Sequence, residues 1–347
     1  PADELGPIVR PQVTGCPVLA DQPRQHLDYA PGTDAALDVD RQGLVGPFVG
    51  HHQALQALAQ TAVPFQVVTW PGAMGGDAAQ SLGLPCRLLP GVPQGESTRG
   101  EDTQALAKEA EGDNVGEIAT LRLWAGRCAV SVLRADPPRG VMVLEWLGES
   151  LEEWWDAEEA TRVVAGLYRD LHRPAAPQLP DGHALVRGWL ADLAALGRKV
   201  PAPPRLVAWA LRAGRELTAS PGTHVVHGDL HYLNVLRRGD DWVAIDPKGF
   251  NADPCLEPVP LMWNRWADLE ASGDVAEALR ERFYAIVDTA GLDERRTRDW
   301  IVTRCMINLG WQAEEGAPPG AGLTDAQEWI TRNIMIATAM QGLEVPE

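Results

Sequence analysis

The sequence of 347 residues contains 30 lysines and arginines against 48 aspartates and glutamates, a formal net charge of −18. A chain this acidic repels polyanions, which argues against nucleic acid as a partner. No run of about 18 uncharged apolar residues occurs, and the first residues lack the basic and apolar regions of a signal peptide. We therefore expect no membrane partner and a cytoplasmic location.

The first 105 or so residues are marked by clusters of glycine and proline, such as those at 70–76 and 89–95. Turn signals this dense leave room for short strands and one helix, which we expect over 53–61. The sequence assigns this segment no role of its own. It is either an added segment or a diverged part of a first lobe.

From residue 104 onward the hydrophobic periodicity becomes regular. Apolar residues at helical spacing predict a helix over 114–124. Two apolar segments bounded by turn signals, 129–134 and 141–147, predict an antiparallel pair of strands. The stretch 104–111 is compatible with a helix at least as well as with a strand. These elements together predict a small mixed lobe.

The rest of the chain is predicted to be mainly helical. Asp156 is a good N-cap residue, and glutamates follow it in the first turn of a predicted helix. A strand over 223–226 leads into the most polar cluster of the sequence. The further predicted helices are 183–196, 204–217, 259–270, 275–289, 294–314 and 325–340. The predicted fold is therefore α+β, with a small lobe over 1–147 and a larger helical lobe over 148–347.

The polar cluster over 225–249 contains the residues with the clearest chemical meaning. Two short apolar strand segments, 235–236 and 242–245, flank a polar turn, so Asp229, Asn234 and Asp246 should converge at one end of a hairpin. Phosphoryl transfer needs one carboxylate at the attacking hydroxyl, and a second carboxylate with an amide oxygen to hold Mg²⁺ against the nucleotide phosphates. The five-residue spacing from Asp229 to Asn234 matches the spacing of protein kinases. Single residues of these types often only cap turns, but the set at these spacings indicates a functional site.

The sequence around these residues resembles the aminoglycoside phosphotransferase family, in the branch of streptomycin 6-phosphotransferase and hydroxyurea phosphotransferase. The resemblance rests on His-Gly-Asp-Leu-His-Tyr-Leu-Asn-Val-Leu from residue 227 and Ala-Ile-Asp-Pro-Lys-Gly from residue 244, and it covers about 105–316. It implies a protein-kinase-like fold of two lobes, a small mixed N-lobe with an antiparallel sheet and a larger helical C-lobe. It further implies that Asp229 is the catalytic base and that Asn234 and Asp246 bind Mg²⁺.

Four further residues are expected to support the catalytic loop. His227 could be a metal ligand or a base, but a structural role is favoured, and His231 is either an exposed loop residue or a brace. Asp253 and Glu257 lie in a segment that resembles the Asp-Pro-x-x-Asp motif of the family, whose expected role is to brace the loop. Glu257 stands where the family usually has aspartate.

The expected nucleotide site lies ahead of this cluster. By the resemblance, backbone groups of Glu145, Trp146 and Leu147 receive the adenine of ATP. A kinase also needs a strand lysine that contacts the phosphates and pairs with a helix glutamate. Lys108, the sole lysine ahead of residue 147, and Glu117 are the candidates for this pair. A solvated lysine is the alternative.

The expected acceptor site is acidic. Residues 229–347 contain 21 acidic and 11 basic residues, a net charge of −10. Glu314 and Glu315 end a predicted helix, where their carboxylates could bind ammonium or guanidinium groups. Trp311 could stack on a sugar ring or a cation, although an aromatic residue at helical spacing is more often part of the core.

These observations predict an ATP- and Mg²⁺-dependent kinase that phosphorylates a hydroxyl of a cationic aminoglycoside antibiotic such as streptomycin and so confers resistance. Two alternatives stay open. One is a kinase of an amino sugar or another small metabolite on the same fold, because the fold and the motif do not identify the acceptor. The other is a non-catalytic protein that binds a cationic antibiotic.

Overall fold

The computed structural model describes residues 105–109, 115–136, 141–315 and 323–342. The helix expected over 53–61 lies outside these residues. The first described element, β1 (Ala105–Glu109), forms an antiparallel sheet with β3 (Val141–Glu145) and β2 (Val132–Asp136), in the order β1-β3-β2. α3 (Val115–Trp124) lies between β1 and β2 in the chain and contacts β2. The predicted helix and strand pair are thus confirmed, and the ambiguous stretch around Lys108 is a strand.

A second hairpin attaches this sheet to the rest of the molecule. It consists of β6 (Val235–Arg238) and β7 (Asp241–Ala244), which pair antiparallel. Ala244 exchanges backbone hydrogen bonds with the segment just before β2, at 2.8 and 2.9 Å, and Arg238 donates to the Gly126 carbonyl at 2.9 Å. The segment after β3 also pairs with the hairpin, because Gly148 N donates to the Arg237 carbonyl at 2.7 Å. The position of the hairpin is therefore fixed relative to the small sheet.

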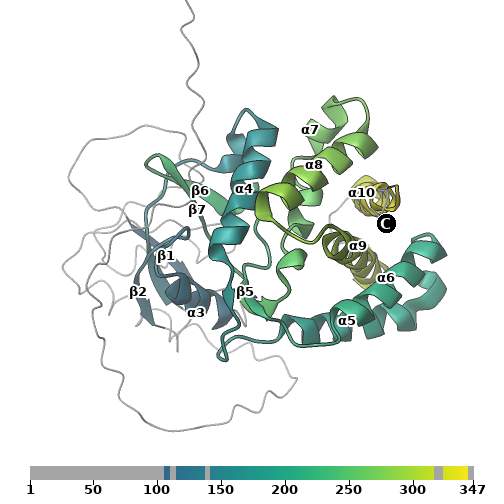
Figure 1. Ribbon diagram of the computed structural model, residues 1–347, viewed down its shortest axis with the longest axis horizontal. Coiled ribbons are helices and arrows are strands. Elements are labelled where there is room, and N and C mark those ends of the chain that lie inside the picture. The colour runs from purple at the N-terminus through teal and green to yellow at the C-terminus, as the bar shows by residue number, and fades with distance from the viewer. Residues whose placement is uncertain (1–104, 110–114, 137–140, 316–322, 343–347) are drawn as a thin grey trace, which may run out of the picture.

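The remainder of the described chain is mainly helical, as the sequence predicts. The small sheet and α3 lie at one end of the molecule, and the helices around α9 lie at the other (Figure 1). A third sheet of short strands has the order β4-β5-β8. The longer elements are α4 (Ala157–Leu171), α5 (Gly182–Leu196), α6 (Pro204–Leu217), α7 (Trp266–Ala271), α8 (Val275–Ala290), α9 (Glu294–Glu315) and α10 (Leu323–Gln341), and the short strands are β4 (Arg173–Pro174), β5 (His224–Val226) and β8 (Phe250–Ala252).

Helix α9 is the centre of the helical part. It packs against α5, α6 and α10, and its middle turns are buried on every side. A helix surrounded in this way needs apolar residues around its whole circumference rather than along one face. Trp300, Ile301, Cys305, Met306 and Leu309 meet this need and belong to one continuous core.

Helix boundaries follow the local signals in the sequence closely, with one exception. Asp156 caps α4 by accepting hydrogen bonds from the first-turn N–H groups, as predicted. The single helix predicted over 259–270 is wrong. A short 3₁₀ turn (Val259–Met262) and α7 replace it, because Arg265 adopts a left-handed conformation with φ 50° between them. The Arg265 guanidinium donates to the Trp154 carbonyl at 2.9 Å, a tertiary contact that helical spacing does not reveal.

The close approach of Gly249 to α3 leads to a testable prediction. Gly249 has φ +64°, and a Cβ there would lie 2.2 Å from Thr120 Oγ1 and 2.5 Å from the Gly116 carbonyl oxygen. We expect Gly249→Ala to lower the free energy of unfolding by about 3 kcal/mol, from backbone strain and overpacking combined. Gly239 is the matched control, since it has φ +58° but nothing within 4 Å, and alanine there should cost only about 1 to 2 kcal/mol. Urea unfolding measures the free energy of unfolding of both variants. Equal losses in Gly249→Ala and Gly239→Ala would contradict the packing argument.

No helix among the described residues is long and apolar enough to span a membrane.

Candidate active site

The three residues predicted to carry the chemistry lie where short strands end. Asp229 follows β5, Asn234 immediately precedes β6, and Asp246 follows β7. Asn234 Nδ2 donates to the Asp229 carbonyl at 2.8 Å, and the Ile245 N–H donates to the Asn234 carbonyl at 2.9 Å. These bonds join the loop after β5 to the end of the hairpin. The sequence prediction that the three residues converge at one end of the hairpin thus agrees with the contacts.

Asp246 has an unusual backbone conformation at this point. Its φ of 58° is in the left-handed region, which favours glycine over residues with a side chain. The backbone on either side is held, because the Lys248 N–H donates to the His227 carbonyl at 2.8 Å. Strained residues held by their surroundings are common at functional sites. Burial raises the pKa of Asp229, and the negative charge of Asp246 adds to this rise.

His227 is a fully buried part of this loop. Its Nε2 lies 2.8 Å from the Ile245 carbonyl, and its Nδ1 lies 3.3 Å from the Asp229 N–H. Burial lowers the pKa of His227 to about 3, so the ring is neutral, with Nε2 protonated and Nδ1 accepting. With both ring nitrogens bonded to backbone, His227 holds the loop in shape.

His231 lies beside the carboxylate of Asp229 and is half-buried. Its Nε2 is 3.9 Å from Asp229 Oδ1 and 3.4 Å from Asn234 Nδ2. Burial lowers the pKa of His231, which makes the neutral ring the dominant form at pH 7. It is therefore placed against both catalytic-loop residues rather than out in solvent.

Glu257 is buried beneath the loop. Its Oε1 accepts a hydrogen bond from the Gly228 N–H at 2.8 Å, one residue ahead of Asp229. Burial raises the pKa of Glu257 to about 7. The glutamate side chain, which is longer than the aspartate usual in the family, thus also reaches the loop.

The buried carboxyl of Glu257 gives the stability of the protein a pH dependence. The pKa of Glu257 is raised from 4.5 to about 7 in the folded protein, so folding favours the protonated carboxyl. Its contribution to the free energy of unfolding is therefore complete below pH 4.5 and is lost as the pH rises through 7. We expect the free energy of unfolding of the wild type, relative to Glu257→Gln, to fall by roughly 2–4 kcal/mol over that window. Urea unfolding at a series of pH values measures the difference. A difference that stays constant with pH would contradict the assignment.

Asp253 is tied to α9 and not to the catalytic loop. Its carboxylate accepts hydrogen bonds from Trp300 Nε1 at 2.8 Å, from the Cys255 N–H at 3.0 Å and from Arg296 Nε. These bonds lower the pKa of Asp253 against the effect of burial. The two acidic residues of the motif therefore have separate tasks, since Glu257 holds the loop and Asp253 holds the helix behind it.

Basic residues near Asp229 partly offset the effect of its burial. Burial raises the pKa of its carboxyl, and the positive charges of Lys248 and Arg304 oppose the rise. Lys248 Nζ lies 3.3 Å from Asp246 Oδ2. Neither basic residue was singled out from the sequence. Lys248 could have been, since it follows Asp246 by two residues in a chain with few lysines, whereas Arg304 is distant in sequence and became apparent only in the fold.

The donor set of Asn234 and Asp246 suits Mg²⁺. Asn234 Nδ2 is directed at the Asp229 carbonyl, so Oδ1, on the other side of the same side-chain amide, is turned away from that carbonyl. One carboxylate and one amide oxygen are a typical protein contribution for Mg²⁺, whose remaining ligands are phosphates and water. No group of three or more His, Cys, Asp and Glu residues that could hold a metal occurs in the described ranges.

The expected nucleotide residues lie on the small sheet and α3. Lys108 is in β1, opposite Met142 of β3, which is the strand position that the prediction requires. Glu117 is completely buried in the first turn of α3. Glu145 ends β3, and its carboxylate accepts from the Ser131 N–H at 2.6 Å and from Arg238. Trp146 and Leu147 follow in the half-buried segment that leads to the helical part.

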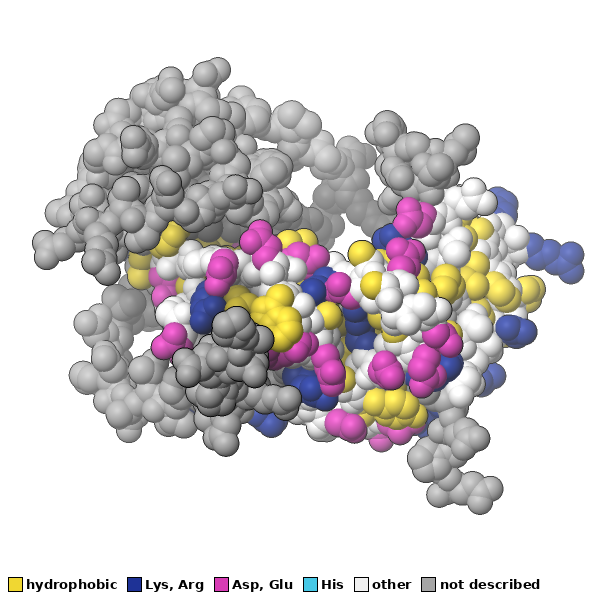
Figure 2. Space-filling view, turned by 90° about the horizontal axis from the view of Figure 1, so that it is seen from above, with side chains coloured by type: hydrophobic (Ala, Val, Ile, Leu, Met, Phe, Trp, Pro, Cys, Tyr) yellow, Lys and Arg dark blue, Asp and Glu magenta, His cyan; other side chains and the backbone are white. Residues whose placement is uncertain are grey.

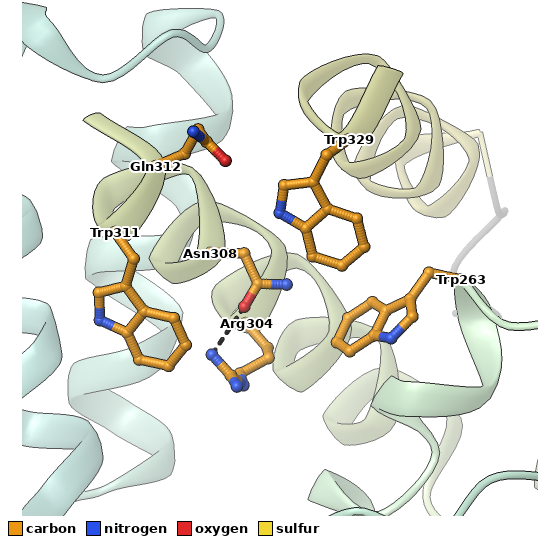
Figure 3. Close-up of a pocket in the computed structure, with 6 residues that line it drawn as sticks. All are labelled: Trp263, Arg304, Asn308, Trp311, Gln312 and Trp329. Carbon is orange, nitrogen blue, oxygen red and sulfur yellow. Dashed lines mark hydrogen bonds between the residues drawn. The ribbon is translucent and has the colours of Figure 1, made fainter. Parts of the chain in front are cut away.

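The expected acceptor residues lie on the last turns of α9. Glu314 and Glu315 are its final residues, and their side chains lie outside the description. Trp311 lines a pocket with residues from α9, from α10 and from the turn before α7 (Figure 3). The pocket is lined by Trp263, Arg304, Asn308, Trp311, Gln312 and Trp329.

Comparison with known proteins identifies the family. A family model described as aminoglycoside/hydroxyurea antibiotic resistance kinase matches residues 98–316. The chain belongs to this family. It is accordingly a kinase, an enzyme that transfers a phosphoryl group, and the expected arrangement of a small mixed part and a larger helical part is confirmed.

Two relatives align with two thirds of the chain or more. A streptomycin 6-kinase of Streptomyces glaucescens is 33% identical over 249 residues, which cover 70% of this chain and 79% of the relative. A hydroxyurea phosphotransferase of Kitasatospora aureofaciens is 35% identical over 244 residues, which cover 67% and 68%. Among solved structures, the choline kinase LicA of Streptococcus pneumoniae matches with 13% identity and a TM-score of 0.47, over 71% of this chain and 88% of that one.

Proposed function

We propose that this kinase transfers the γ-phosphoryl group of ATP to a hydroxyl of a cationic aminoglycoside, with streptomycin as the first acceptor to test. The observation that carries the proposal is that Asp229, Asn234 and Asp246 lie together at the strand ends. Asn234 Nδ2 donates to the Asp229 carbonyl at 2.8 Å, and Ile245, the neighbour of Asp246 in the chain, donates to the Asn234 carbonyl at 2.9 Å. In this arrangement one carboxylate faces the acceptor, and the other two oxygen donors are available to the nucleotide. The streptomycin 6-kinase relative supports the choice of acceptor.

The proposed reaction assigns each group a role. The oxygen of the acceptor hydroxyl attacks the γ-phosphorus, and Asp229 accepts the proton of this hydroxyl. The attack is in line with the bond between the γ-phosphorus and the β-γ bridging oxygen. This bond breaks, and ADP leaves. Asn234 and Asp246 would hold Mg²⁺, which would neutralise charge on the phosphates.

We also propose the division of labour between the two parts of the chain. Residues 1–147 form the lobe that receives the nucleotide, with Lys108 and Glu117 as the phosphate-side pair and Glu145 to Leu147 at the adenine. Residues 148–347 form the catalytic and acceptor-binding lobe, in which His227, His231 and Glu257 hold the loop. Glu314, Glu315 and Trp311 contribute to the acceptor site.

The charge of the chain favours a cationic acceptor. Acidic residues outnumber basic ones by 21 to 11 over 229–347. Acidic side chains are spread over the described part of the face in Figure 2, with basic ones between them. Such a field raises the local concentration of cations.

The test is ATP consumption by the full chain with a panel of acceptors. We expect turnover with streptomycin and much less with glucosamine or hydroxyurea. Turnover of glucosamine in preference to streptomycin would indicate an amino-sugar kinase. Binding of streptomycin without ATP consumption would indicate a non-catalytic antibiotic-binding protein.

A further inference from the structure

The tryptophan pocket, defined by Trp263, Arg304, Asn308, Trp311, Gln312 and Trp329, has a volume of about 250 Å³. In Figure 3, Trp311 faces Trp263 and Trp329 across the pocket, with Arg304 and Asn308 between them. Trp263 and Trp329 meet edge to face with ring centroids 5.5 Å apart. The walls therefore offer aromatic surfaces with polar groups between them.

Arg304 is fixed in this pocket by several contacts. Its guanidinium carbon lies 4.3 Å from the ring centroid of Trp311 and 5.3 Å from that of Trp189. Its Nη1 donates to Asn308 Oδ1 at 2.7 Å, and Asn308 Nδ2 in turn donates to Asn333 Oδ1 of α10 at 3.0 Å. Helix α10 thus holds Asn308, and Asn308 holds the guanidinium.

A pocket of tryptophans would ordinarily attract a cation, because the faces of aromatic rings are electron-rich. Here that position is taken by the protein's own guanidinium, which lies over Trp311. No carboxylate lines the pocket among the residues whose side chains are described. A second cation entering the pocket would meet a like charge and would lack this aromatic face.

The pocket adjoins the catalytic residue. Arg304 is close enough to Asp229 for each charge to affect the pKa of the other, and burial lowers the pKa of Arg304 to about 10, which leaves it protonated at pH 7. The pocket also contains Trp311, which the proposed function assigns to the acceptor site.

We propose that the tryptophan pocket holds an uncharged sugar ring of the acceptor, and that Arg304 excludes ammonium and guanidinium groups from it. The proposal rests on the proposed function, because it takes the ligand to be the phosphoryl acceptor. Apolar sugar faces pack on tryptophan rings, and hydroxyls bond to side-chain amides and guanidinium groups, and both kinds of group line this pocket. The cationic groups of an aminoglycoside would then lie outside the pocket, toward the acidic surface.

The experiment compares two probes that differ by one charge, methyl glucoside and its 2-amino counterpart, protonated at pH 7. Binding to the full chain without ATP is followed by tryptophan fluorescence and checked by calorimetry. We expect the wild type to bind the neutral sugar more tightly by on the order of tenfold, the effect of one like charge at short range. Equal affinity, tighter binding of the amino sugar, or no detectable binding of the neutral sugar would overturn the proposal, whether or not any variant folds.

Variants assign the effect to the pocket. Arg304→Lys keeps the charge and should keep the preference, whereas Arg304→Gln should bind both probes alike. Trp329→Phe should remove much of the fluorescence change, and Trp155→Phe, at a position 78% exposed, should leave it intact. A preference that persists in Arg304→Gln would contradict the role of the guanidinium. Because no turnover is measured, failure to phosphorylate streptomycin would count against the proposed function alone.

Discussion

Replacement of Asp229 by asparagine should reduce phosphoryl transfer by at least about 10²–10⁴-fold, the usual contribution of a general base. The amide has nearly the same shape but cannot take the proton of the attacking hydroxyl. Hydrogen bonds to the loop backbone, such as that from Asn234 Nδ2 to the Asp229 carbonyl, do not involve the replaced group. The loop should therefore keep its conformation, and ATP should bind nearly as tightly as to the wild type.

Two assays on the same preparation check this prediction. Initial rates with saturating ATP give the loss of kcat, and calorimetric titration with a non-hydrolysable ATP analogue gives the nucleotide affinity. Asp240→Asn is the matched control, because Asp240 is exposed in the turn of the β6–β7 hairpin and has no assigned role. Wild-type rates in Asp229→Asn would show that another group takes the proton.

Replacement of Asp253 by alanine should have the largest effect on stability. It removes the acceptor of hydrogen bonds from the Trp300 indole, the Cys255 N–H and Arg296, and it leaves the indole and the N–H buried without this partner. Each unsatisfied buried group costs about 1–3 kcal/mol, so we expect the free energy of unfolding to fall by roughly 3–5 kcal/mol. Cys255 and Trp300 are fully within the core, so solvent cannot replace the lost bonds.

Glu277→Ala is the control for this effect. Glu277 pairs with Arg280 on the surface of α8, and its side chain is 54% exposed, so the loss should stay within about 1 kcal/mol. Urea unfolding followed by circular dichroism measures both variants. Similar losses in the two would mean that the carboxylate of Asp253 does not hold α9 in place.

Local signals allowed most helices and strands to be predicted from the sequence. The cap at Asp156 and the apolar spacing of α6 depend on neighbours in the chain, and the observed α6 has the predicted bounds. The break at Arg265 could not be predicted in this way, because it is stabilised by the Trp154 carbonyl, more than a hundred residues away. Local pattern is informative only where local interactions decide the conformation.

The same distinction applies to the site. Asp229, Asn234 and Asp246 are close in sequence because one loop and one hairpin carry them, so their spacing was enough to predict them together. The tryptophan pocket combines Trp263, Arg304 and Trp329, which only the packing of separate segments brings into contact. Asp253 and Glu257 are four residues apart yet bond to different elements, which their shared motif does not reveal.

The most direct test of the proposed reaction is the product itself. Streptomycin is incubated with the full chain, ATP and Mg²⁺, and is then examined by mass spectrometry and ³¹P NMR. The proposed function predicts that streptomycin gains the mass of one phosphoryl group, with a phosphorus resonance of an alkyl phosphate monoester, and that ADP forms in equal amount. Unmodified streptomycin after complete binding, with no ADP formed, would contradict it.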